Sequence, residues 1–70
     1  MTKNDIIIEI IQNLSRNYII NMSIRDKEKP IGFLLTYIRD VYGLSKTEGW
    51  DIAIYILNHY NIKNELYNNF

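Results

Sequence analysis

The sequence has 70 residues and a formal net charge of zero, because eight basic and eight acidic side chains are interspersed along it. A chain of this length suffices for one domain with one small core, so we treat residues 1–70 as a single domain. Nucleic-acid-binding proteins usually carry a basic excess, which makes such a partner unexpected here. The sequence has no cysteine. Disulfides and thiolate metal sites are therefore excluded, and a reducing, cytoplasmic location is the natural expectation.

Hydrophobic residues make up 47% of the chain, which argues against disorder. The longest apolar runs, residues 6–8 and 52–57, are far shorter than the roughly 20 residues that a membrane span needs. We therefore expect no membrane segment. The sequence also contains 14 isoleucines and nine asparagines. Both residues have AT-rich codons, so this composition indicates an AT-rich genome.

The first predicted helix begins at residues 2–5, where Thr2 and Asp5 resemble a capping box with aspartate in place of glutamate, and Asn4 is a competing N-cap. We expect this helix to extend to about Asn17. Residues 18–24 are rich enough in β-branched side chains to form either more helix or a strand. On a helical wheel one apolar stripe spans about 160° and contains Ile6, Ile7, Ile10, Ile11, Leu14, Tyr18 and Met22.

The second predicted helix follows a charged loop at residues 23–29 and begins with Pro30, which suits a first helical turn. Gly43 should end it in the left-handed conformation, with Leu44 folded back on Ile38 as in a Schellman motif. The next helix begins almost at once, because residues 45–48 form a full capping box. We therefore predict a tight corner between the second and third helices.

The third helix, residues 45–60, is predicted to be central, with Trp50, Ile54 and Leu57 in the core. Its apolar residues cover an arc of roughly 200°, so it should pack against at least two neighbours. If it continued further, the apolar residues after Tyr60 would project on its polar side. We therefore expect a break and a short fourth helix that Asn61 caps, with a stripe formed by Ile62, Leu66 and Phe70.

The predicted fold is all-α, a compact bundle of three main helices plus a short C-terminal fourth helix. No catalytic, cofactor-binding or metal site is expected in it. His59 is the only histidine, and Asp51 lies two helical turns away, too far to orient it. Glu48 and Asp51 suit the first turn of a helix without any catalytic role. We therefore predict that the protein is not an enzyme.

The most informative functional feature is an apparent surplus of apolar surface. Several large side chains lie beside the predicted helical stripes and either cover the edges of the core or form an interface. We predict a small non-enzymatic protein-interaction module, such as a regulator, an inhibitor or an accessory subunit. Its partner is another protein or a second copy of the chain in a homodimer. The candidate interaction surface comprises Ile8, Ile19, Ile20, Phe33, Tyr37 and Tyr55.

Residues 34–53 resemble the helix–turn–helix corner of ubiquitin-associated-type three-helix domains. The similarity rests on an aliphatic-Arg-acid-x-x-Gly pattern ending at Gly43, followed by Glu48 and Gly49. Trp50 departs from the pattern, because those families usually have lysine there. The resemblance implies a protein-binding module. The alternative is a DNA-binding regulator that uses the corner within residues 31–60, although the second helix of the corner shows few basic residues.

Overall fold

The computed structural model describes residues 1–68 and consists of four α-helices joined by short connections. Its longest dimension is 39 Å and its shortest is 16 Å. No strand occurs between residues 1 and 68, so the predicted all-α class is confirmed. The helices are α1 (Lys3–Asn13), α2 (Arg16–Asp26), α3 (Pro30–Tyr42) and α4 (Lys46–His59).

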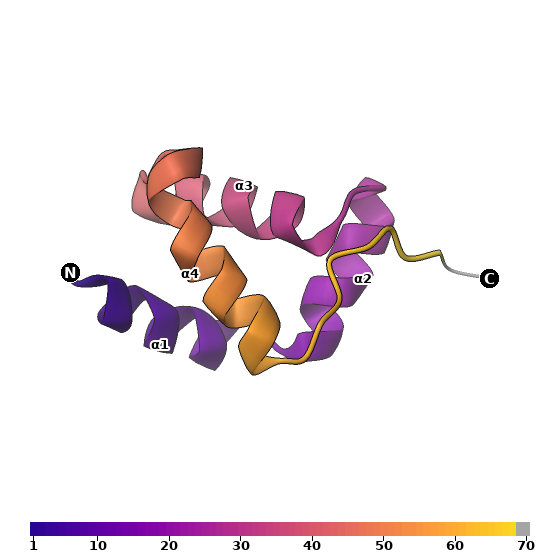
Figure 1. Ribbon diagram of the computed structural model, residues 1–70, viewed down its shortest axis with the longest axis horizontal. Helices are drawn as coiled ribbons and strands as arrows, with labels where there is room; N and C mark the ends of the chain where they lie inside the picture. Colours follow the sequence, from indigo (N-terminus) through magenta and orange to yellow (C-terminus); the bar gives the residue numbers. More distant parts are fainter. Residues whose placement is uncertain (69–70) are drawn as a thin grey trace.

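Helix α4 packs against both α1 and α3, and α2 packs against α3 near the N-terminal end of that helix (Figure 1). Direct packing therefore links the helices in the order α1, α4, α3, α2. The prediction that residues 45–60 have at least two neighbours is confirmed. The two inner helices, α3 and α4, are also the two that meet at the predicted corner.

The first predicted helix is in fact two helices, which corrects its expected extent. Leu14 is extended, with φ −117° and ψ 118°, and Ser15 caps a new helix by accepting a hydrogen bond from the Tyr18 N–H at 3.1 Å. A serine hydroxyl at this position competes with a continuous helix because it satisfies a free N–H of the next one. Residues 18–24, for which helix and strand were both open, belong to α2.

The corner between α3 and α4 forms as predicted. Gly43 has φ 69°, and its N–H donates to the Arg39 carbonyl at 2.9 Å. This is the simpler left-handed helix end rather than the predicted Schellman motif. Both bonds of the capping box are present. The Glu48 N–H donates to Ser45 Oγ at 3.2 Å, and the Ser45 N–H donates to the Glu48 carboxylate at 3.0 Å.

The short helix predicted after Tyr60 does not form within residues 61–68, because Asn61 ends α4 instead of starting a new helix. Asn61 has φ 53°, and the N–H of Ile62 donates to the Leu57 carbonyl at 2.9 Å. This is a Schellman end, in which asparagine replaces the usual glycine and Ile62 packs back into the core. Residues 61–68 have no regular structure, Leu66 is exposed, and Phe70 lies outside the described residues.

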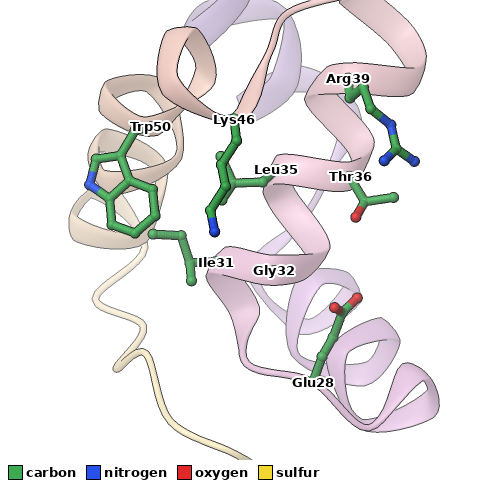
Figure 2. A pocket seen from close by; sticks show the side chains of 8 residues that line it. All are labelled: Glu28, Ile31, Gly32, Leu35, Thr36, Arg39, Lys46 and Trp50. Atoms are coloured by element: carbon green, nitrogen blue, oxygen red, sulfur yellow. The ribbon is translucent and has the colours of Figure 1, made fainter.

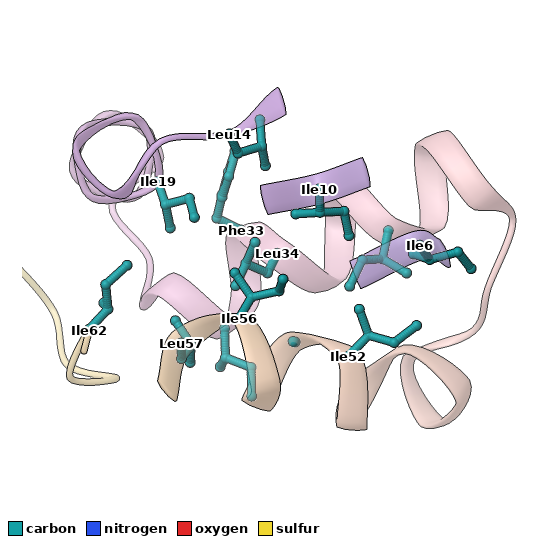
Figure 3. Packing of buried hydrophobic residues seen from close by; sticks show 13 residues of the cluster. Ile6, Ile10, Leu14, Ile19, Phe33, Leu34, Ile52, Ile56, Leu57 and Ile62 are labelled. Atoms are coloured by element: carbon teal, nitrogen blue, oxygen red, sulfur yellow. The ribbon is translucent and has the colours of Figure 1, made fainter. Parts of the chain in front are cut away.

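The core lies where all four helices converge (Figure 3), and it corrects two predictions about α4. Leu57 is buried as predicted, but Trp50 is 43% exposed and Ile54 is 36% exposed. Neither therefore anchors the core. The buried cluster consists of Ile6, Ile10, Leu14, Ile19, Ile31, Phe33, Leu34, Ile38, Ile52, Ala53, Ile56, Leu57 and Ile62.

Three helix ends are capped by side chains from distant parts of the chain. The Tyr60 hydroxyl donates to the carbonyls of Leu14 (2.6 Å) and Ile11 (3.0 Å), just where α1 ends. Arg16 Nε donates to the Tyr60 carbonyl at 2.8 Å, where α4 ends. Ile31, at the start of α3, donates its N–H to Asn64 Oδ1 at 3.1 Å. These bonds fasten residues 60–64 to three helices and satisfy terminal backbone groups that have no partner within their own helix.

Candidate interaction groove

The six residues predicted to form an interaction surface do not lie together on the surface. Ile19 and Phe33 are buried in the core, so they are not available to a partner in this structure. Ile20 and Tyr37 are half-buried against the same core. Ile8 on α1 and Tyr55 on α4 are exposed. The apolar surplus that the sequence suggested is thus mostly absorbed into the core of a single copy.

Phe33 and its neighbours explain why large side chains beside the stripes are covered. The Phe33 ring makes an edge contact with Tyr18 of α2, with ring centroids 6.3 Å apart. The centroid of the Phe33 ring also lies 6.4 Å from that of Tyr37 on the same helix. These aromatic contacts join α2 to α3. Side chains outside the stripe of α3 therefore pack against α2, a helix that was not predicted to be separate from α1.

An open groove with a volume of about 360 Å³ lies between α3 and the first half of α4 (Figure 2). Ile31 and Leu35 supply its apolar floor, and the indole of Trp50 forms one wall. A second shallow depression adjoins it, sharing Lys46 and Trp50. The groove is lined by Glu28, Ile31, Gly32, Leu35, Thr36, Arg39, Lys46 and Trp50.

The position of Trp50 follows from its neighbour Gly49. A Cβ atom on Gly49 would lie only 3.0 Å from Ile38 Cγ2, so the missing side chain lets α4 approach α3 closely. Gly49 and Ala53, which are both buried, therefore face α3. Trp50 follows Gly49 in α4, so its side chain projects to one side of this contact. It lies at the edge of the α3–α4 interface, next to Ile31. A large aromatic side chain is consequently left nearly half exposed.

Charged groups occupy the two ends of the groove. Arg39 lies at one end and Glu28 at the other, with the Lys46 side chain extending between Trp50 and α3 (Figure 2). Arg39 also pairs with Asp40 at 3.1 Å, an exposed contact that leaves the guanidinium accessible. The carboxylate of Glu28 lies over Gly32, because its Oε2 is 2.7 Å from where a Cβ would stand. An apolar floor flanked by opposite charges suits a peptide or helix better than a small metabolite.

The remaining polar groups serve the structure. The Ser45 N–H and hydroxyl hold the pKa of the Glu48 carboxyl below its ordinary value, as expected for a carboxylate that caps a helix. Burial, together with a 2.6 Å hydrogen bond to Glu9, raises the pKa of Tyr42 well above its ordinary value. That bond joins α3 to α1.

Potential metal ligands are scattered rather than clustered in residues 1–68. No group of three potential metal ligands lies together in this part of the chain. His59 is exposed at the end of α4, with its ring edge-on to Tyr60 at a centroid distance of 4.9 Å. Asp51 contacts Lys3 of α1 at 3.4 Å and not His59. Among the helices of residues 1–68, none combines the length and hydropathy needed to cross a bilayer.

No protein-family model, curated protein or solved structure matches this chain. The resemblance of residues 34–53 to ubiquitin-associated-type domains therefore stays a prediction. The groove was not predicted from the sequence, because Trp50 was expected to lie in the core. The available signal was the pair Gly49–Trp50, since a buried helical glycine indicates a close helix approach that forces its bulky neighbour outward.

Proposed function

We propose that the protein is a small cytoplasmic, non-enzymatic interaction module that binds a protein partner through the groove between α3 and α4. One observation carries this proposal: Trp50, the only tryptophan, stands 43% exposed as the wall of a groove with an apolar floor. Tryptophan is among the residues most enriched at binding hot spots, where its large apolar surface becomes covered on association. The module acts as a regulator, an inhibitor or an accessory subunit.

The surroundings of Trp50 support binding by a preformed surface. The floor residues lie on α3, which packs against α4 through the fully buried Leu34 and Ile38. The Ser45 capping box fixes the start of α4 one turn before the indole. A partner therefore meets a groove whose backbone is already ordered, which reduces the entropy lost on binding.

The test compares two exposed aromatic residues on α4. Tyr55→Ala is the matched control, because Tyr55 is 53% exposed but lies outside the groove. Wild type and both variants are used to capture proteins from a lysate of the source organism. A captured protein is then purified, and its affinity for each variant is measured by calorimetry. We expect Trp50→Ala to weaken binding by about 30-fold or more and Tyr55→Ala to change it little.

Two other outcomes would contradict this proposal. If Trp50→Ala binds as tightly as wild type, the groove is not the binding surface. If the protein instead retains DNA with a steep salt dependence, the alternative of a DNA-binding regulator within residues 31–60 is favoured. The exposed face of α4 offers little support for DNA binding, since Asp51, Tyr55 and Asn58 lie on it.

A further inference from the structure

The residues that α3 and the preceding loop contribute to the groove follow a regular order. The residues within α3 recur at helical spacings of one and three, which places them along one face, and Glu28 reaches this face from the preceding loop with its carboxylate over Gly32. Along this face an acidic residue comes first and a basic residue comes last, and large side chains alternate with small ones in between. The series is Glu28, Ile31, Gly32, Leu35, Thr36 and Arg39.

We propose that the occupant of the groove is a second copy of this chain, docked so that the two α3 helices cross antiparallel about a two-fold axis. This inference rests on the proposed function, whose binding surface it uses. In such an arrangement, residues at equal distances from the midpoint between residues 33 and 34 face each other across the axis. Glu28 then meets Arg39 of the second copy, Ile31 meets Thr36, and Gly32 meets Leu35.

The charges select this register over its neighbour. In the chosen register each copy places an acid against a base at both ends of the contact. A shift of the midpoint to residue 34 would place Lys29 against Arg39 of the second copy, and Glu28 against Asp40. Both of those are like-charge pairs, which an interface disfavours. The zero net charge of the chain adds no overall repulsion between two copies.

Side-chain direction brings the charged pair into reach. The carboxylate of Glu28 already lies over Gly32, one turn inside the start of the groove. Side chains on a helix point toward its N-terminus, so Arg39 of the second copy leans back toward the level of its own Leu35. In the proposed register, Leu35 of the second copy faces Gly32. Acid and base therefore meet over the same turn.

The small residues make room for the large ones of the second copy. Gly32 has no side chain and is half-exposed, so a helix can approach there beside the flexible Glu28 side chain that lies over it. Glycine inside a helix lowers its stability relative to alanine, so its presence on an open face agrees with a contact made at that point. The half-buried Leu35 of the second copy packs beside Gly32 and against the Glu28 side chain that lies over it. The indole of Trp50 in each copy borders the contact and becomes covered when the copies meet.

The proposal is tested by exchanging the charges between copies. Glu28→Arg alone gives two Arg–Arg contacts in a dimer, and Arg39→Glu alone gives two Glu–Glu contacts. Sedimentation equilibrium should show wild type dimerising between about 1 and 500 μM, and each variant dimerising at least about tenfold more weakly. An equimolar mixture of the two variants should recover the wild-type affinity, because every acid again meets a base.

Control variants change the same charges elsewhere. Glu65→Arg and Lys63→Glu alter exposed residues outside the groove, so they should leave dimerisation unchanged. Circular dichroism checks that each variant folds, and the emission of Trp50 should shift to the red on dilution. A wild type that stays monomeric at about 500 μM overturns the dimer, as does a mixture no stronger than its components. In either case, loss of partner binding in Trp50→Ala would still support the proposed function.

Discussion

The two faces of α3 differ in how they are covered, although both lie beside α4. The inner face contributes Leu34 and Ile38, which are fully buried, and Gly49 of α4 packs directly against it. The outer face leaves Gly32 and Thr36 accessible in the groove. A glycine lies at each of these faces, Gly49 of α4 at the inner one and Gly32 at the outer one, and the two have different effects on packing. Gly49 lets two helices of one chain meet, whereas Gly32 lets the Glu28 carboxylate lie against the surface of α3.

The largest expected effect is at the inner face. Leu34→Ala should lower the free energy of unfolding by about 2–5 kcal/mol, because the fully buried side chain leaves a cavity between α3 and its neighbours. Urea denaturation measures this loss. Thr36→Ala on the outer face is the matched control and should change stability by less than about 0.5 kcal/mol. Equal effects at the two positions would remove the distinction between the faces.

An intermediate effect is expected for Trp50→Ala at the edge between the two faces. Since the indole is only partly buried, the loss should be about 1–2 kcal/mol, well below the 3–5 kcal/mol typical of a large core aromatic residue. Thermal denaturation tests the stability. The native emission spectrum of wild type tests the exposure, because this is the only tryptophan. A strongly blue-shifted emission from the monomer would place Trp50 in the core instead.

The smallest effects compare the two glycines, and they should differ in sign. Gly32→Ala should stabilise the fold by roughly 0.5–1 kcal/mol, since alanine favours helix and the clashing Glu28 carboxylate ends a flexible side chain. Gly49→Ala should instead destabilise it by about 1 kcal/mol, because the new Cβ meets the buried Ile38 at 3.0 Å. Paired denaturation curves check both values. A stabilising Gly49→Ala would show that α3 and α4 can separate easily.

Local signals in the sequence predicted the parts of the fold that local chemistry determines. The capping boxes at Thr2 and Ser45 and the left-handed Gly43 each depend on residues within one turn, and all three form. The break at Ser15 was missed because the apolar period of α1 continues in phase into α2. Asn61 was predicted to cap the start of a new helix, but it ends α4. Asparagine suits both an N-cap and a left-handed helix end, so its identity does not distinguish the two.

The candidate site was less predictable, because exposure depends on which elements meet. Ile19 lies outside the stripe of one long helix but inside the core once α2 turns away at Ser15. Trp50 shows the reverse. It belongs to the apolar arc of α4, yet the close contact at Gly49 rotates it to the edge. Hydrophobicity and helical period determine which residues favour burial, but not which ones a small core has room for.

The bonds from Tyr60, Arg16 and Asn64 to distant helix ends make the folding of the helices interdependent. The last turn of α1, the first turn of α3 and the end of α4 each obtain hydrogen-bond partners only when residues 60–64 are in place. Fraying at one end therefore releases a partner needed at another. We expect the amide hydrogens around these three ends to exchange with solvent as one cooperative unit, so that the chain behaves as a single foldon despite its four short helices.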